Sequence, residues 1–427
     1  MDESSYDYNP VSDFSSILVP EDGYAYVDGL DEFISTDRGD TEVVYFLNHV
    51  FPQALHEGAS DIHFIHHVKG FRVRFRINGV LEDRYFLNSE AARDLDLKIR
   101  SRCMLATSER EAPLDGSFFM LIDGRRVDVR VSILPNSLGQ SIVCRLLDQN
   151  NAGRTLDSIW MPDAVREVLL QTLALEEGLI LNVGPTGSGK TSTLYACLNH
   201  LNRPGIHICT VEDPVEYSLP GANQVTVRAP ERTFAKVLRS FLRQDFDVGL
   251  VGEIRDAETA NIALAAANTG HLMLSTLHTR STLATVSRLA DLGVKHYELA
   301  DTIRLIVAQR LLKRLCPHCS MPYEMDDLER DALAAEEGGH LVDTYGQYWV
   351  ANPDGCDACE GGYIGRVPVM EMLAGTRELK AAIESTDRAT MVKRAYEQHQ
   401  YQPLIVAGTV MSANRLVDFH AALKINM

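Results

Sequence analysis

Residues Gly184–Thr191 (GPTGSGKT) match the pattern G-x-x-x-x-G-K-[ST], which is typical of loops that bind the phosphates of a nucleotide. In such a loop the glycines let consecutive backbone N–H groups converge on phosphate oxygens, and Lys190 supplies a positive charge to the outer phosphates. The hydroxyl of Thr191 can coordinate Mg²⁺ at the start of the following helix. We therefore predict a nucleotide-binding loop formed by Gly184, Pro185, Thr186, Gly187, Ser188, Gly189, Lys190, Thr191 and Ser192.

Acidic residues follow two further apolar segments of the chain. Glu253 ends the segment DVGLVGE, where a carboxylate can orient or deprotonate the water that attacks the terminal phosphate. We take Glu253 as the candidate general base, although an acid at a strand end is common by itself. The segment VEDPVEY carries three acids that could hold Mg²⁺ through water or stabilise the geometry of the site: Glu212, Asp213 and Glu216.

Two histidines border the apolar segment LMLSTL. His271 precedes this segment and His278 follows it. A single histidine is more often structural than catalytic, so the residues by themselves leave both interpretations open.

Four of the eight cysteines form two C-x-x-C pairs, which are separated by 36 residues. Two such pairs supply the four thiolates of a tetrahedral Zn²⁺ site, whereas a redox pair normally occurs singly beside a thioredoxin-like pattern. Four cysteines leave no open coordination position, so we expect a structural zinc and do not expect His318 to be a ligand. The predicted ligands are Cys316, Cys319, Cys356 and Cys359.

The composition limits the class of protein. The 427 residues are 45% hydrophobic, which is enough for a sizeable core and for two or three domains. The net charge of −18 disfavours broad contact with nucleic acid or an anionic membrane surface. The acidic segment 1–13 does not resemble a signal peptide, and no apolar run approaches the ~18 residues that span a bilayer. We expect a cytosolic protein in a reducing compartment, where clustered cysteines more often bind metal.

The elements that must position these residues belong to an α/β chain. Residues 1–40 have little periodicity and predict a flexible segment. A small α+β domain follows, and then strands and helices alternate as in a parallel sheet. Its strands are expected at 178–183, 207–211, 248–251 and 271–277. The predicted domains are 41–149 (α+β), 150–155 (linker), 156–315 (P-loop core), 316–366 (cysteine segment) and 367–427 (C-terminal helices).

Together, the strings GPTGSGKT, VEDPVEY, VGEIRDAETA and TGHLMLSTLHT resemble the secretion ATPase superfamily of type II secretion and type IV pili. The similarity runs from about residue 41 to about residue 373. The upstream strings ALHEGASDIHF, FRINGVL and VDVRVSILPNSLGQSIVCRLLD resemble the N2 domain of that family. The resemblance implies a PAS-like N2 domain followed by a RecA-like P-loop ATPase core with a zinc-binding tetracysteine insert.

The resemblance also implies residue roles. The four strings correspond to the Walker A, Asp-box, Walker B and His-box segments of a hexameric ATPase. Glu253 then takes the catalytic role, Glu212 lies on the metal side, and His271 and His278 sense the nucleotide. Four arginines would reach the nucleotide or complete a contact between subunits: Arg130, Arg145, Arg239 and Arg243. For each of them, an ordinary salt bridge is an equally good interpretation.

The implied function is a cytoplasmic homohexamer that uses ATP and Mg²⁺, contains Zn²⁺, and drives assembly of a type IV pilus or a type II secretion pseudopilus at the bacterial inner membrane. Its expected partners are an inner-membrane platform protein and a cytoplasmic-domain adaptor, with no nucleic acid. The tetracysteine segment favours the extension branch over pilus retraction. A conjugation-type secretion ATPase, a nucleic-acid translocase and a non-hydrolysing scaffold are the alternatives.

The sequence departs from the family pattern in several places. Only some forty residues precede the N2-like region, where members of the assembly branch usually carry a docking domain. Gln140, Phe246 and Pro368 stand where the family generally has Glu, Pro and Gly. None of these three belongs to the phosphate-binding loop.

Overall fold

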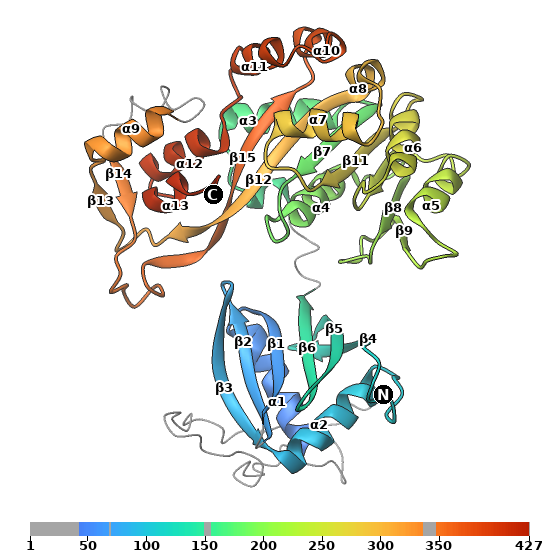
Figure 1. Cartoon of the computed structure of the whole chain (residues 1–427), viewed down its shortest axis with the longest axis vertical. Helices are drawn as coiled ribbons and strands as arrows, with labels where there is room; N and C mark the ends of the chain where they lie inside the picture. The colour runs from blue at the N-terminus through green and yellow to red at the C-terminus, as the bar shows by residue number, and fades with distance from the viewer. Residues whose placement is uncertain (1–41, 68–69, 149–154, 336–346, 427) are drawn as a thin grey trace. The chain divides into compact units, whose positions relative to one another are not determined.

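The computed structural model describes residues 42–67, 70–148, 155–335 and 347–426, which divide into two compact units on either side of Asn150 (Figure 1). The predicted flexible segment 1–40 lies outside the described residues, as does almost all of the predicted linker. Among the described residues, no helix combines the length and the apolar character needed to cross a membrane.

The N-terminal unit is an antiparallel sheet of six strands in the order β3-β2-β1-β6-β5-β4. Its strands are β1 (Ala59–His67), β2 (Gly70–Ile77), β3 (Val80–Asn88), β4 (Leu114–Ile122), β5 (Arg125–Asn136) and β6 (Gly139–Asp148). Helices α1 (Glu42–His56) and α2 (Ser89–Arg102) contact each other and share one hydrophobic core with the sheet. The predicted Asn78–Gly79 turn joins β2 to β3.

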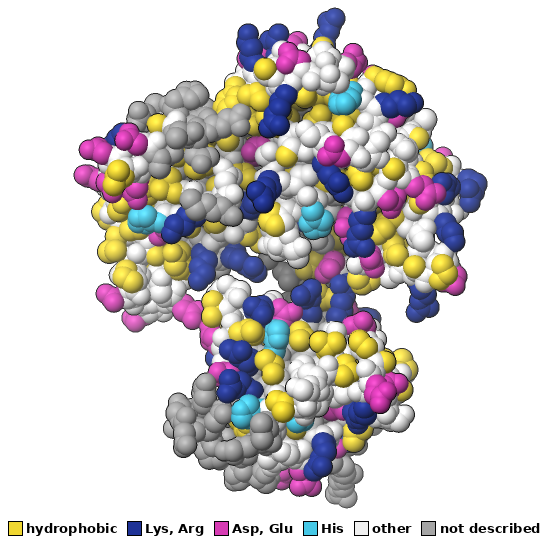
Figure 2. All heavy atoms as spheres, viewed as in Figure 1, with side chains coloured by type: hydrophobic (Ala, Val, Ile, Leu, Met, Phe, Trp, Pro, Cys, Tyr) yellow, Lys and Arg dark blue, Asp and Glu magenta, His cyan; other side chains and the backbone are white. Residues whose placement is uncertain are grey.

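Side chains alternate across this sheet, because successive residues of a strand point to opposite faces. On β2, Phe71, Val73 and Phe75 are buried in the core, while the arginines between them are partly exposed on the other face. Figure 2 shows hydrophobic side chains gathered over β4 and β5, where Phe119 and Leu121 are 57% and 71% exposed.

The C-terminal unit is built on a sheet of seven strands in the order β15-β12-β7-β11-β10-β8-β9. Its strands are β7 (Gly178–Val183), β8 (Ile208–Glu212), β9 (Asn223–Thr226), β10 (Val248–Val251), β11 (Leu272–Leu277), β12 (Ile303–Leu315) and β15 (Tyr363–Ala374). All neighbouring strands are parallel except β15, which runs antiparallel to β12. Every residue of β7, β8, β10 and β11 is buried, as expected for a parallel sheet covered on both faces.

Helices cover both faces of this sheet. On β7, Leu179 and Leu181 belong to one hydrophobic core and Ile180 to another, so the two cores lie on opposite faces. One face is covered by α3 (Asp163–Leu173) and α4 (Lys190–Leu201). On the other face, the strands are contacted by α5 (Phe234–Phe241), α6 (Ala257–Ala267) and α7 (Thr282–Asp291). The same hydrophobic core also includes residues of α8 (His296–Thr302), α10 (Arg377–Glu384), α11 (Arg388–Tyr396), α12 (Leu404–Ala413) and α13 (Phe419–Leu423).

The α/β fold class predicted from the sequence is confirmed. Strands β12 and β15 were not expected from the sequence, and they extend the sheet beyond its predicted strands. β15 also runs across residue 366, where the sequence analysis ended the cysteine segment. The domain boundaries therefore remain predictions.

Candidate active site

The phosphate-binding motif forms the connection between β7 and α4. Gly189 caps α4 in a left-handed conformation (φ 87°), and a Cβ there would lie 2.8 Å from Nε2 of Gln309. Only glycine accommodates both the backbone conformation and this close approach. The loop thus packs directly against strand β12, which is not among the strands expected from the sequence.

Gln309 of β12 forms buried hydrogen bonds to this loop and to the elements on both sides of it. Its side chain is 1% exposed, and its Oε1 accepts hydrogen bonds from Nδ2 of Asn182 (3.1 Å) and Oγ1 of Thr193 (2.9 Å). Its Nε2 donates to the backbone oxygen of Ser188 (2.9 Å). One amide therefore fixes the end of β7, the loop and the first turn of α4. A glutamine directly after the apolar run 305–308 is the sequence signal that could have pointed to it.

Lys190 lies across the loop. Its Nζ donates to the backbone oxygens of Gly184 (2.8 Å) and Pro185 (2.9 Å). Burial lowers the pKa of Lys190 to about 8, against the opposing effect of the negative charge on Glu253. A phosphate group bound here would favour the charged form of the lysine and provide a stronger acceptor than the two carbonyl groups.

A cavity of about 530 Å³ opens beside the loop, within the size range of small-molecule sites. Residues 186–192 of the loop line it together with Glu212, Glu253 and His278. Arg255 and Arg366 also line it, although no sequence motif indicates a role for either residue. The structure therefore brings together the loop and three of the predicted site residues.

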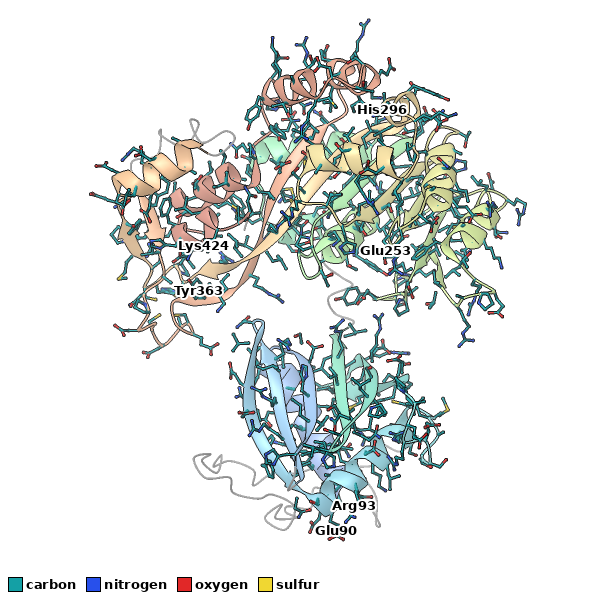
Figure 3. All side chains as sticks on the ribbon, in the orientation of Figure 1. Glu90, Arg93, Glu253, His296, Tyr363 and Lys424 are labelled. Carbon is teal, nitrogen blue, oxygen red and sulfur yellow. The ribbon has the colours of Figure 1, made fainter. Side chains whose placement is uncertain are left out.

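Glu253, which Figure 3 labels, follows strand β10. His278 follows the neighbouring parallel strand β11, so the two residues lie at the same end of the parallel strands. Nε2 of His278 is 3.7 Å from Oε2 of Glu253. Arg255 pairs with Glu253 and lies 3.5 Å from a carboxylate oxygen of Asp213. The carboxylate of Glu253 is thus bordered by a histidine and an arginine at the cavity wall.

Glu212 ends β8 and is 4% exposed. The hydroxyl groups of Thr210 (2.6 Å to Oε1) and Tyr195 (2.8 Å to Oε2) donate to its carboxylate. Burial raises the pKa of Glu212, and the hydrogen bonds from Thr210, Tyr195 and Gln224 oppose this shift. Both carboxylate oxygens of Glu212 therefore already accept hydrogen bonds from the protein.

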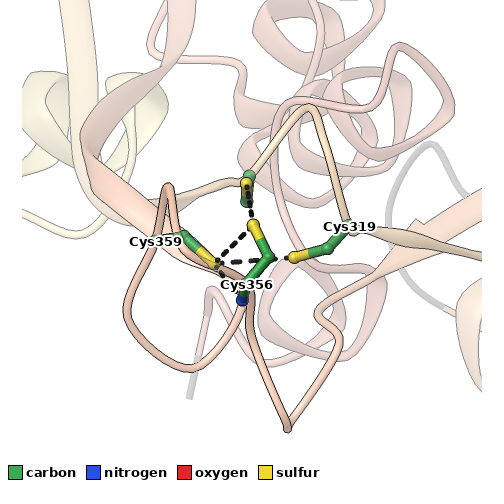
Figure 4. A group of neighbouring side chains, drawn as sticks. Cys319, Cys356 and Cys359 are labelled. Carbon is green, nitrogen blue, oxygen red and sulfur yellow. Dashed lines mark hydrogen bonds between the residues drawn. The ribbon is translucent and has the colours of Figure 1, made fainter.

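The four predicted zinc ligands also converge, although 36 residues separate the two pairs. All four thiols are free, and their Sγ atoms lie within 4.8 Å of one another. Sγ–Sγ distances include 3.7 Å for Cys316 and Cys356 and 3.5 Å for Cys319 and Cys359 (Figure 4). A tetrahedral site with Zn–S bonds of ~2.3 Å requires about 3.8 Å between sulfurs, so the donor set fits zinc.

Comparison with known proteins identifies the family of the chain. A family model described as "Type II/IV secretion system protein" matches residues 36–424. The chain belongs to this family. It is 39% identical to the type IV pilus assembly ATPase PilB of Pseudomonas aeruginosa over 396 residues, which cover 92% of this chain and 69% of PilB. It is 42% identical to a putative type II secretion system protein E of Escherichia coli over 366 residues, which cover 84% and 72% of the two chains.

Two solved structures share the fold. The pilus retraction motor PilT with bound ADP matches with a TM-score of 0.63 at 24% identity, covering 88% of this chain and 95% of PilT. The Legionella pneumophila ATPase DotB matches with a TM-score of 0.67 at 21% identity, covering 91% and 97%. The family model and the named relatives identify the chain as an ATPase of the secretion and pilus-assembly ATPase family.

In this secretion ATPase, His271 lies at the other end of β11 from His278 and does not line the cavity. Its ring stacks on Phe246 with 4.3 Å between centroids, and its Nδ1 lies 3.0 Å from the backbone oxygen of Ala266. The structure therefore does not bring the two histidines together. Phe246, which departs from the family pattern, forms part of the environment of His271.

The four predicted arginines of the ATPase lie outside the cavity wall. On α5, Arg239 pairs with Glu258 of α6 (2.6 Å), and Arg243, which follows that helix, donates to the backbone oxygen of Arg239 (3.0 Å). Arg130 and Arg145 are in the N-terminal unit, directly opposite each other on β5 and β6. Nε of Arg145 is 3.0 Å from a carboxylate oxygen of Asp61. Each pair thus has contacts within its own unit, and the catalytic roles remain predictions.

Proposed function

We propose that this ATPase hydrolyses Mg-ATP as a homohexamer and powers assembly of a type IV pilus or a type II secretion pseudopilus at the bacterial inner membrane. One observation carries the proposal: a single cavity gathers Lys190, Glu212, Glu253 and His278 at the carboxyl edge of the parallel sheet. A lysine for the outer phosphates, an acid on the side of the metal and a group that orients or deprotonates water are parts that phosphoryl transfer to water uses.

Lys190 would leave the carbonyl groups of the loop and contact the outer phosphates. The hydroxyl of Thr191 would coordinate Mg²⁺ directly. Glu212 would hold the metal through a water molecule, because both of its carboxylate oxygens already accept hydrogen bonds from the protein. When bound, the metal supplies neutralisation of charge that develops on the phosphates. Among the three acids considered at the sequence level, Glu212 is the most buried.

Glu253 would accept the proton of the attacking water or orient that water. The neighbouring Arg255 and His278 border its carboxylate and are suited to respond to a bound terminal phosphate. We assign His278 a role in sensing nucleotide. The location of His271 at the far end of the strand supports no direct contact with nucleotide within one subunit.

The tetracysteine cluster would hold one structural Zn²⁺, and Arg130, Arg145, Arg239 and Arg243 would complete sites in the hexamer. The names of PilB and of protein E support the extension and secretion branch. In that case the partners are an inner-membrane platform protein and a cytoplasmic-domain adaptor, and the ATPase is cytoplasmic and peripheral to the membrane. The net charge of −18 supports the absence of nucleic acid from this list.

Two substitutions test the roles at the site. Lys190→Ala should abolish nucleotide binding or turnover, whereas Glu253→Gln should retain ATP without hydrolysing it, because only the second change removes the group that acts on water. Fluorescent-nucleotide titration and phosphate release measure the two steps separately. Equal loss of binding in both variants would contradict this division of roles. Strong stimulation of hydrolysis by single-stranded DNA would instead favour the translocase alternative.

A further inference from the structure

Tyr195 is the side chain that links helix α4 to Glu212. It is 1% exposed, and its hydroxyl oxygen is 2.8 Å and 3.1 Å from the two carboxylate oxygens of Glu212. The same hydroxyl accepts a hydrogen bond from Nε2 of Gln224 (3.1 Å). Burial and the negative charge of Glu212 raise the pKa of Tyr195, so its hydroxyl keeps the proton that it donates.

The carboxylate of Glu212 is also confined from other sides. Thr210 donates to it from the same strand (2.6 Å). A Cβ on Gly252, which follows β10, would lie 3.2 Å from Cα and 3.6 Å from Cγ of Glu212. A side chain at position 252 would therefore press on Glu212, and the glycine lets the two strand ends approach. Tyr195 is the contact that ties this confined carboxylate to helix α4, which begins at the end of the phosphate-binding loop.

The position of Tyr195 in α4 explains why this link matters. Residues four apart lie on the same face of a helix, so Tyr195 follows Thr191 by one turn on the same face of α4. Both residues line the cavity. Tyr195 therefore connects the helix that begins with Lys190 and Thr191 to the carboxylate of Glu212.

We propose that Tyr195 is a positioning residue, whose hydroxyl holds the carboxylate of Glu212 in register with Thr191 at the nucleotide cavity. The inference rests on the metal-side role proposed above for Glu212. Tyr195 itself contacts neither the phosphates nor the attacking water in this scheme; it acts through Glu212.

Tyr195→Phe removes the hydroxyl and keeps the ring. The hydrogen bond to the charged carboxylate is lost, so we expect kcat to fall at least about tenfold, with a smaller change in the KM for ATP. Addition of Mg²⁺ should also strengthen binding of a fluorescent ADP analogue less than in the wild type. Tyr297→Phe is the matched control, because that phenol is 52% exposed on α8 and contacts Lys295 and Glu298. Thr210→Val should reproduce the effect from the other side of the carboxylate, with Thr210→Ser as its hydroxyl-retaining control.

A double-mutant cycle with Glu212→Gln decides whether Tyr195 acts through Glu212. If it does, Tyr195→Phe should add little to the loss caused by Glu212→Gln. If the loss in kcat of the double variant equals the product of the two single losses, the inference is overturned. It is likewise overturned in favour of a merely structural role if Tyr195→Phe lowers the melting temperature but leaves the Mg²⁺ dependence of binding unchanged. If turnover is slow in Glu212→Gln but equals that of the wild type in Tyr195→Phe, the inference about Tyr195 is overturned while the proposed role of Glu212 stands. Wild-type turnover in Glu212→Gln would overturn the proposed role of Glu212 and the inference with it.

Discussion

Gln309→Leu should loosen the phosphate-binding loop, because the substitution removes all three side-chain hydrogen bonds beneath it. The amide of Gln309 contacts Asn182, Thr193 and the backbone oxygen of Ser188, and all of these contacts are buried. A buried hydrogen bond contributes ~1 kcal/mol to stability, so three correspond to about 3 kcal/mol. At ~2 to 4 °C per kcal/mol for a unit of this size, the melting temperature of the C-terminal unit should fall by about 6 to 12 °C.

The same change should weaken nucleotide binding, since the backbone N–H groups of the loop lose their fixed arrangement. We expect the Kd for ADP to rise about tenfold, which corresponds to ~1.4 kcal/mol. Calorimetric melting and fluorescent-ADP titration measure the two effects.

The matched control is Gln171→Leu on α3, where the amide donates to Glu167 at the surface. This variant should change stability by no more than ~0.5 kcal/mol. A Gln309→Leu protein that melts within about 2 °C of the wild type and binds ADP equally well would refute the reasoning.

Because burial lowers the pKa of free Lys190 to about 8 and bound phosphate favours its charged form, ADP affinity should be highest below pH 8 and fall as the pH rises above it; calorimetry should detect proton uptake on binding at the higher pH, and pH-independent affinity would contradict this. Cys356→Ser should release zinc, as elemental analysis would show, and expose segment 316–335 to protease; since Arg366 of β15 lines the cavity, nucleotide affinity should fall as well, and unchanged affinity would argue that the two sites are independent. Specific activity should rise with assembly, and a flat value across the monomer-to-hexamer range would count against the proposed hexamer.

The sequence alone determined the features that are encoded in short segments. The phosphate-binding loop is made from consecutive backbone groups, so Gly184–Thr191 specify it without reference to the rest of the chain. Each C-x-x-C pair is likewise local, and two pairs suffice to predict the tetracysteine cluster. Glu253 and His278 each follow an apolar segment, so the sequence also places both residues at the ends of strands. That these two strands are neighbours came from the structure.

Strand length would have separated His271 from His278 even at the level of sequence. A strand rises ~3.3 Å per residue, so residues seven apart at its two ends cannot reach the same site. The family resemblance places both histidines in one segment, but in the structure they lie at opposite ends of the same strand, β11.

Only the tertiary structure decided which distant side chains support the site. Strand β12 brings Gln309 beneath a loop that is more than a hundred residues earlier, and β15 brings Arg366 to the cavity. Tyr195 has a local signal, since it is one turn after Thr191, but its partner Glu212 comes from another strand. The order of strands in a sheet depends on which apolar faces pack together, and no short segment contains that information.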